Sequence, residues 1–376
     1  MPSSIAPGPR LTRLAQTLPA TVPFVGPEAQ ERAMGHPFTA RLGANENVFG
    51  PSPKAIAAME KAASEIWMYG DPESHDLRHA LAAHHGVKPE NIMVGEGIDG
   101  LLGYLARLTV EEGDSVVTSE GAYPTFNYHV AGFGGTLVKL PYHDDREDLP
   151  ALLDKAAETG AKLVYFANPD NPMASYTPGA DITVQLDRIP DGTLLALDEA
   201  YVEFAPAEAV PEIDINDPRV IRFRTFSKAY GMAGARVGYA LAAEPLITAF
   251  HKIRNHFGMN RAAQAGALAA LADQPYLAQT IADVAHAREE ITRIAAANGL
   301  KALPSATNFV AIDCGAGAEL AGQLLKELVA RGIFVRMPFA APGNRCIRLS
   351  CGRPRDLAAF EAALPEALAA ARDAVG

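Results

Sequence analysis

Apolar and polar positions follow one rhythm over the first two thirds of the chain. From about residue 52 to residue 241, helical patterns alternate with short apolar runs bounded by polar residues, glycine or proline. This alternation is typical of an α/β domain with a largely parallel sheet. A helix is expected from Pro53, because Ser52 can cap it and proline fits a first helical position. A second helix is predicted at 74–85, and strands are predicted at 115–119, 136–140, 163–167, 194–197 and 220–224.

The pattern changes after about residue 245 to long helices rich in alanine and leucine, followed by short strands. We expect helices at 274–297, 318–330 and 356–371, and strands at 309–312, 333–335 and 347–350. This texture predicts a second, smaller α+β domain. The chain is therefore divided into an N-terminal arm or small-domain segment (1–40), a large domain (41–255) and a small C-terminal domain (256–376).

Composition narrows the class of protein. The 376 residues are 48% hydrophobic and 20% charged, which excludes a wholly disordered chain and a coiled coil. The net charge of 33 − 44 = −11 argues against binding to nucleic acid or to an anionic membrane. Apolar runs fall short of the roughly 20 residues of a membrane span, and no secretory signal is evident.

The three cysteines suggest a reducing compartment. Cys314, Cys346 and Cys351 are too few for a disulfide framework and match no zinc spacing, so no metal site is expected. We interpret them as buried thiols of a cytoplasmic protein.

The most informative segment follows the predicted strand at 220–224. Ser227, Lys228 and Arg236 place a hydroxyl, an amine and a guanidinium around a glycine-bearing turn. A lone lysine is usually a solvated surface residue. After a buried strand, however, a loop can present these groups to a ligand.

Two further polar groups end apolar strands. Asp198 closes the run at 194–197, and a carboxylate there is costly to bury unless it meets a cation, for which a protonated heteroaromatic nitrogen is one candidate. Residues 167–172 form an Asn/Pro-rich turn after another strand. Standing alone, that segment would be an ordinary turn.

Together these residues resemble the aspartate aminotransferase fold type, fold type I, of enzymes that use pyridoxal 5'-phosphate (PLP), and specifically the histidinol-phosphate aminotransferase family. The resemblance spans nearly the whole chain in the family's order. It covers residues 44–47, 69–73, 94–99, 123–125, 167–172, 198–201, 227–228 and 347–349. It implies a large PLP-binding domain with a mostly parallel, seven-stranded sheet and a smaller α+β domain.

The resemblance assigns roles around the cofactor ring. Lys228 would form the Schiff base with the cofactor aldehyde and then shuttle protons. Asp198 would pair with the pyridine nitrogen, which lets the ring accept electrons. Tyr201 and Asn171 would hydrogen-bond the ring oxygen, and Tyr123 would stack on the ring face.

The cofactor phosphate would lie where a turn enters the predicted helix at 99–108. Backbone N–H groups of Gly97, Ile98 and Asp99 can hold an anion there. A plain helix start capped by Asp99 is the alternative, which the surrounding sequence disfavours. Ser227 and Arg236 would add a hydroxyl and a bidentate guanidinium.

Other positions match substrate-binding residues of the family. Arg348 matches the arginine that grips the substrate carboxylate, a paired contact that lysine cannot reproduce. Asn168 and Asn45 would assist at that end. Arg336 and Phe24 stand near positions that contact the far phosphate of histidinol phosphate.

Tyr69 resembles the tyrosine that reaches the phosphate from the other subunit, which implies a homodimer.

Three departures from the family's pattern leave the identity of the substrate open. Phe24 stands where a tyrosine is usual, Gly100 replaces an acidic residue, and residues 173–174 are Met-Ala where Thr-Gly is usual.

The resemblance therefore implies an aminotransferase. It would move an amino group between an amino acid or a histidinol-phosphate-like amine and a 2-oxo acid such as 2-oxoglutarate, in amino-acid biosynthesis. An aromatic amino acid is a second candidate donor. The same scaffold also fits a PLP-dependent decarboxylase or lyase, similar to threonine-phosphate decarboxylases, or a noncatalytic binding protein that retains the fold.

Overall fold

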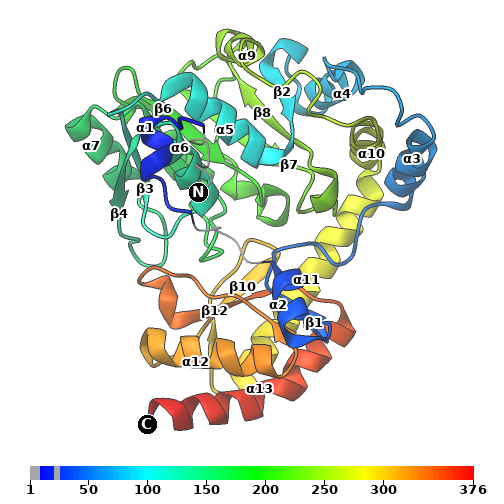
Figure 1. The fold of residues 1–376 in the computed structure, drawn as a ribbon, viewed down its shortest axis with the longest axis vertical. Coiled ribbons are helices and arrows are strands. Elements are labelled where there is room, and N and C mark those ends of the chain that lie inside the picture. Colours follow the sequence, from blue (N-terminus) through cyan, green and yellow to red (C-terminus); the bar gives the residue numbers. More distant parts are fainter. Residues whose placement is uncertain (1–8, 21–25) are drawn as a thin grey trace, which may run out of the picture.

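A seven-stranded sheet forms the centre of the larger of two lobes (Figure 1). The computed structural model describes residues 9–20 and 26–376. The strands run in the order β2-β8-β7-β6-β5-β3-β4, and all are parallel except β8, which is antiparallel to both neighbours. Their bounds are β2 Ile92–Gly95, β3 Ser115–Ser119, β4 Thr136–Leu140, β5 Leu163–Ala167, β6 Leu194–Asp198, β7 Val220–Thr225 and β8 Gly238–Ala242.

The five strands predicted for this sheet are confirmed. Strands β2 and β8 were not predicted separately, because β2 has only four residues and the Gly-Tyr-Ala-Leu-Ala sequence of β8 lacks the β-branched residues that favour strands. The seven-stranded, mostly parallel sheet implied by the family resemblance is also confirmed.

Helices cover both faces of the large sheet, and the alternation of side chains along each strand explains how. In β5, Tyr165 packs into the cluster with α5 and α6, whereas Val164 and Phe166 point to the opposite face and pack with α7. The α-helices of this lobe are α3 Pro53–Ala63, α4 His75–His85, α5 Gly97–Thr109, α6 Pro124–Gly132, α7 Leu149–Thr159, α8 Gly179–Thr183, α9 Glu244–His251 and α10 Arg261–Ala272. The predicted cap is present, because Ser52 Oγ accepts a hydrogen bond of 3.2 Å from the Ala55 N–H.

The smaller lobe is an α+β unit. Its antiparallel sheet has the order β12-β10-β9, with β9 Lys301–Ala302, β10 Phe309–Asp313 and β12 Cys346–Ser350. Helices α12 Gly317–Ala330 and α13 Pro354–Val375 pack beside it. The 24-residue helix α11, Gln274–Ala297, runs from the larger lobe into the smaller one (Figure 1).

The segment that ends at residue 41 reaches the smaller lobe, whereas its first helix is drawn over the larger lobe (Figure 1). Helices α1 Arg13–Thr17 and α2 Pro27–Met34 precede a short strand β1, Ala40–Arg41. The strand predicted at 333–335 is the two-residue strand β11, Ile333–Phe334. It pairs in parallel with β1 rather than with β10 or β12.

The division of the chain at residue 256 stays a prediction. Helix α10 follows that point, yet it packs on α3 and α4 in the larger lobe. We therefore propose that the two domains meet within α11.

Candidate active site

The sheet topology brings the sequence-predicted residues to one edge. The carboxyl ends of β5 and β6 lie side by side, with Ala167 opposite Asp198. Strand β8 runs the other way and starts at this edge, where Gly238 pairs with both Thr225 and Gly95. The turns that follow β2, β5, β6 and β7 therefore meet where ligands bind in open α/β sheets.

Lys228 lies inside the site, partly buried. Its Nζ donates a hydrogen bond of 3.0 Å to the backbone oxygen of Asn45 and lies 5.4 Å from the centre of the Tyr201 ring. Burial, followed by the nearby positive charge of Arg348, lowers the pKa of Lys228 to about 8. Near neutral pH this amine is therefore neutral far more often than an exposed lysine, whose pKa is about 10.4.

Asp198 is a buried carboxylate at the end of β6. Its Oδ2 accepts from the Tyr165 hydroxyl at 2.7 Å and its Oδ1 from the Ala200 N–H at 2.9 Å. Both donors are uncharged, and burial raises the pKa of Asp198. Lys228 and Asp198 also influence each other electrostatically, which places the amine and the carboxylate around the same space.

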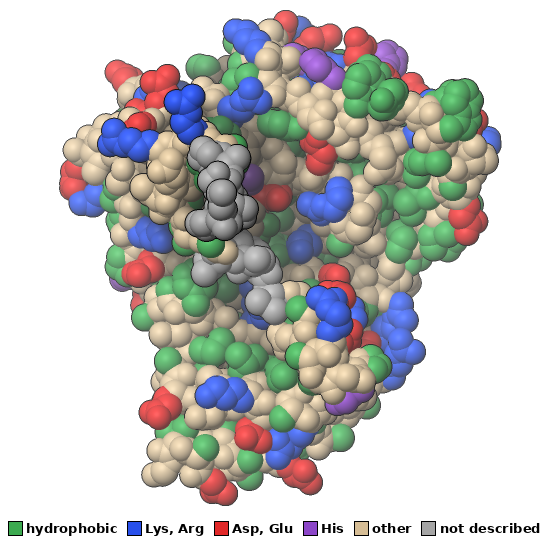
Figure 2. All heavy atoms as spheres, viewed as in Figure 1, with side chains coloured by type: hydrophobic (Ala, Val, Ile, Leu, Met, Phe, Trp, Pro, Cys, Tyr) green, Lys and Arg blue, Asp and Glu red, His purple; other side chains and the backbone are tan. Residues whose placement is uncertain are grey.

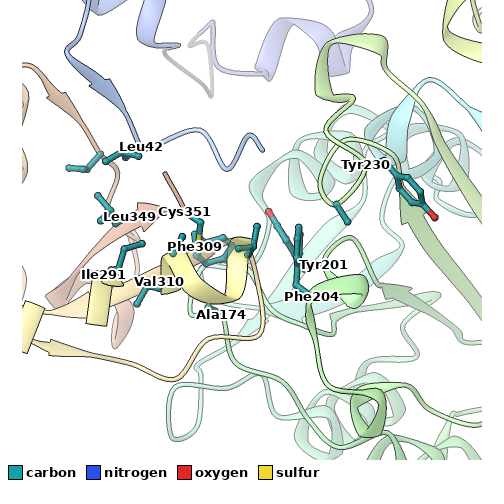
Figure 3. Close-up of a cluster of buried hydrophobic side chains, with 14 of the residues drawn as sticks. Leu42, Ala174, Tyr201, Phe204, Tyr230, Ile291, Phe309, Val310, Leu349 and Cys351 are labelled. Carbon is teal, nitrogen blue, oxygen red and sulfur yellow. The ribbon is translucent and has the colours of Figure 1, made fainter. Parts of the chain in front are cut away.

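Tyr201 connects the two lobes at the site. Its hydroxyl accepts a hydrogen bond of 3.2 Å from Asn45 Nδ2, and its ring meets the Phe309 ring edge-on at 5.4 Å. Figure 3 shows Tyr201 next to Phe204 and facing Phe309 of the smaller lobe. Burial raises the pKa of Tyr201 to about 12, so the phenol stays protonated and can donate to a ligand oxygen.

Arg348 on β12 provides the cation of the site. Its Nη1 donates to Asn171 Oδ1, and its guanidinium lies 5.2 Å from the Phe309 ring centre. Its Nε is buried and has no hydrogen-bond partner among the described residues. Burial lowers the pKa of Arg348 to about 10. This fork is therefore desolvated and has donor capacity left for an anion.

Arg336 lies beside Arg348, because the backbones of the two residues pair with each other at 3.2 and 2.6 Å. Its guanidinium lies 5.2 Å from the Phe334 ring centre. The two positive charges repel, and Arg336 contributes to the lowered pKa of Arg348. Figure 2 shows a hollow between the lobes with Lys and Arg side chains in it.

A second anion cradle forms at the start of α5. Gly97 has φ +80°, and a Cβ there would lie 2.5 Å from Arg236 Nη2. Arg236 Nη1 lies 3.4 Å from Ser227 Oγ, and Gly238 lets β8 approach the Ile98 N–H. The first N–H groups of a helix have no intrahelical acceptor, so this arrangement can hold a phosphate.

A plain helix start capped by Asp99 does not describe the structure. Helix α5 begins at Gly97 with Glu96 as its N-cap and without a side-chain cap. The Asp99 carboxylate instead contacts His129 Nε2 at 2.8 Å.

Tyr123 directly precedes α6. Burial is the main cause that raises its pKa, to about 12, and the nearby Asp198 and Tyr201 raise it further, which places Tyr123 close to both.

Two predicted residues do not join this cluster. The Asn168 side chain bonds the backbone of Thr177 and Ala209, at 2.8 to 3.0 Å, so its contacts favour a structural role. Tyr69 is 77% exposed and packs against Phe257 on the surface. Phe24 lies outside the described residues.

Sequence reasoning missed the hydroxyl that supports Asp198. Tyr165 sits in the otherwise apolar strand β5, and a single phenol inside such a run was the available signal. It also missed the buried Glu199, which bonds Arg222 at 2.7 and 3.1 Å and Arg224 at 2.9 Å. Glu199 supports the segment that carries Asp198 and Tyr201.

This fold and this set of groups define a PLP-dependent aminotransferase of fold type I. The chain belongs to the aminotransferase class I and II family, which matches residues 39–363.

Known proteins support that assignment. The chain is 54% identical to the histidinol-phosphate aminotransferase from Sinorhizobium meliloti, solved in complex with pyridoxal-5'-phosphate. The TM-score is 0.94, and the match covers 97% of this chain and 99% of that one. It is 37% identical to a histidinol-phosphate aminotransferase of Anaeromyxobacter sp. (strain Fw109-5), over 91% of this chain and 94% of the relative. An aspartate aminotransferase of Thermus thermophilus, 22% identical with a TM-score of 0.80 over 96% and 100% of the two chains, shares the fold.

The residues present fit PLP. The buried Asp198 carboxylate suits a protonated ring nitrogen, the Gly97–Arg236 cradle suits a phosphate, and the unpaired Arg348 Nε suits an acid group. No group of three or more potential metal ligands is found within the described parts of the chain. Nor does any helix described there combine the length and apolar character needed to cross a membrane.

Proposed function

We propose that this aminotransferase moves an amino group from histidinol phosphate, or a closely similar amine, to a 2-oxo acid such as 2-oxoglutarate. The observation that carries the proposal is the convergence of Lys228, Asp198 and Arg348 on one space beside a phosphate cradle. The names of the relatives support histidinol phosphate as the donor.

The residues that would hold the cofactor follow from the contacts of the site. Asp198 would pair with the ring nitrogen, Tyr201 and Asn171 with the ring oxygen, and Tyr123 with the ring face. Backbone N–H groups from Gly97 to Asp99, together with Ser227 and Arg236, would bind the phosphate. PLP supplies an aldehyde that reacts with amines and a ring that accepts electrons.

Lys228 would be the base. Because its pKa is lowered to about 8, Nζ would accept the proton that leaves the substrate α-carbon and would return it at the carbon that carries the aldehyde of PLP, across the intervening nitrogen. Asn45 holds this amine in place through its backbone oxygen and also contacts the Tyr201 hydroxyl.

Two guanidinium groups would read the acidic ends of the substrates. Arg348 can bind a carboxylate of the 2-oxo acid with two parallel hydrogen bonds. The neighbouring Arg336 adds a second positive charge at this end, which suits a second carboxylate or the phosphate of the amine.

A donor-by-acceptor screen tests the proposed function. We expect the visible cofactor band to shift with histidinol phosphate and 2-oxoglutarate to yield glutamate. A response confined to aromatic amino acids would show that the amino donor is an aromatic amino acid and not histidinol phosphate. Release of carbon dioxide without a keto product would indicate a decarboxylase.

Lys228→Ala is the companion variant. It should retain the fold but lose both turnover and the cofactor adduct that borohydride fixes covalently, because the reacting amine is gone. Lys252→Ala, at an exposed lysine after α9, is the matched control and should behave as the wild type. A borohydride-fixed cofactor in Lys228→Ala would refute the assignment.

We also propose a homodimer in which Tyr69 completes the partner's site. Four large side chains here are more than half exposed: Ile66, Trp67, Tyr69 and Phe257. The rings of Tyr69 and Phe257 lie 4.7 Å apart in a tilted arrangement. A group of exposed aromatic residues marks an interaction surface.

We further propose that the enzyme is cytoplasmic. The three cysteines are free and buried, which suits a reducing compartment.

A further inference from the structure

Two carboxyl groups lie buried together behind the residues that face the substrate. Glu147 belongs to the loop between β4 and α7, and Asp170 belongs to the turn after β5. Their exposed fractions are 5% and 2%. The two side chains lie within hydrogen-bonding reach of each other, a contact that raises the pKa of Glu147 and lowers that of Asp170. Because ionised carboxylates only accept hydrogen bonds, one of the two must hold a proton.

The contacts of Asp170 are those of the ionised partner. Its Oδ1 accepts from the Tyr142 hydroxyl at 2.8 Å, and its Oδ2 accepts from the Met173 N–H at 2.9 Å. With a proton from Glu147 it receives three donors, which favours the charged form. The positive charge of Arg348 favours it further.

The contacts of Glu147 are those of the neutral partner. Its Oε2 accepts from Ser119 Oγ at 2.7 Å and its Oε1 accepts from the Ala167 N–H at 3.1 Å. Neither contact brings a cation. Burial and the negative charge of Asp170 raise the pKa of Glu147 well above its ordinary value, whereas the pKa of Asp170 rises only to about 6, mainly through burial.

The ionisable groups that act most strongly on this pair come from several elements. The positive charge of Arg348 on β12 acts on Asp170. Three buried phenols also interact with the pair, and each is neutral because burial raises its pKa: Tyr142, Tyr165 and Tyr201. Between pH 5 and pH 7, Asp170 is therefore the member of this group that changes charge.

Asp170 is adjacent to Asn171, whose side chain accepts a hydrogen bond from Arg348. We propose that Glu147 stays protonated and donates to Asp170, so that the pair carries one negative charge behind Asn171 and moderates the hold of Arg348 on the acid group of a substrate. Both are positioning residues, because they act through Asn171 and Arg348. The inference rests on the proposed role of Arg348.

The first test locates the proton in the holoenzyme at pH 7 without using activity. In difference spectra against the wild type, the protonated-carboxyl infrared band should lose one component in Glu147→Gln and keep it in Asp170→Asn; Glu203, whose pKa burial raises to about 7, adds a component that is the same in all three proteins. Glutamine keeps a neutral donor toward Asp170, so the variant should fold and retain PLP. A component that survives Glu147→Gln and disappears in Asp170→Asn would overturn the proposal.

The second test measures the binding of glutarate, a dicarboxylate that cannot react, through its effect on the cofactor spectrum. In the wild type and in Glu147→Gln, we expect the Kd to rise about fivefold from pH 5 to pH 7, because the charge on Asp170 then opposes the anion. Asp170→Asn should lack this rise, so the ratio of the wild-type Kd to the Asp170→Asn Kd should increase about fivefold, and the ionisation of glutarate itself cancels in that ratio. Equal pH dependence in wild type and Asp170→Asn would overturn the inference, whereas a failed donor screen with these shifts intact would reject only the proposed substrates.

Discussion

At the scale of single residues, the phosphate cradle depends on a glycine that has no room for a side chain. Gly97 combines a φ of +80° with an approach of Arg236 Nη2 to 2.5 Å from the position of a Cβ. Gly86, which ends α4, has φ +67° but nothing within 4 Å of that position. A comparison of alanine variants at Gly97 and Gly86 therefore separates the cost of backbone strain from the loss of the anion site.

We predict that Gly97→Ala and Gly86→Ala each cost about 1 kcal/mol of unfolding free energy, because both place alanine in the left-handed region. Only Gly97→Ala should also weaken PLP binding, by about tenfold or more, since its methyl group displaces Arg236. Thermal unfolding and PLP titration of the apoenzyme measure the two effects. Equal PLP affinity in both variants would contradict the assigned cradle.

The type of a residue did not by itself show whether its side chain belongs to the site. Asn168 and Asn171 stand in the same turn, and the sequence offered both as ligand-binding amides. In the structure, the Asn168 side chain donates hydrogen bonds to the backbone oxygens of Thr177 and Ala209. The Asn171 side chain instead accepts a hydrogen bond from Arg348. That difference depends on partners far away in the chain, which no local pattern contains.

At the scale of elements, an ionic contact joins the smaller lobe to the loop between β4 and α7. Arg345 binds both carboxylate oxygens of Asp145, at 2.8 and 2.9 Å, and Asp313 at 2.8 Å. Asp144 and Asp145 have φ of 49° and 61°, a conformation that non-glycine residues adopt at a cost. The guanidinium therefore holds a strained loop that also carries Glu147.

We predict that Arg345→Gln lowers the unfolding free energy by roughly 1–3 kcal/mol, because the pair is partly buried and its removal leaves two carboxylates unpaired. Amide exchange in residues 142–148 should become faster. Arg188→Gln, in a more exposed pair with Asp154, should change stability by less than about 1 kcal/mol. Unchanged exchange in Arg345→Gln would show that the loop does not depend on this contact.

At the scale of the whole molecule, the exposed group around Trp67 and Tyr69 is the feature that a monomer leaves unexplained. Trp67 is 80% exposed and Tyr69 77%. In the proposed dimer, Tyr69 of one chain serves the site that contains Lys228 of the other. Subunit mixing tests this directly.

Tyr69→Ala and Lys228→Ala should each have little activity alone, the first because phosphate binding is weakened and the second because the amine is absent. Mixing the two variants under conditions of subunit exchange should restore activity, because one site of each mixed dimer has both residues. Sedimentation checks that dimers form. Activity that stays at the level of the separate variants, with mixed dimers present, would contradict the shared site.

The amino-acid sequence by itself determined most of the helices and strands and the class of chemistry. Periodicity predicted the central strands and the long helices, since burial of one face imposes spacings that local sequence records. Strand ends followed by Asp198, Asn171 and Lys228 indicated a site, because parallel strands present their carboxyl ends at one edge.

The tertiary structure alone decided how those groups are used. It paired β11 with β1, placed Asp198 beside Tyr165, and set Glu147 against Asp170 across separate turns. Each of these contacts joins segments whose proximity results from packing of the whole chain. Desolvation, which changes the proton affinity of Lys228 and of the acid pair, exists only once that packing is complete.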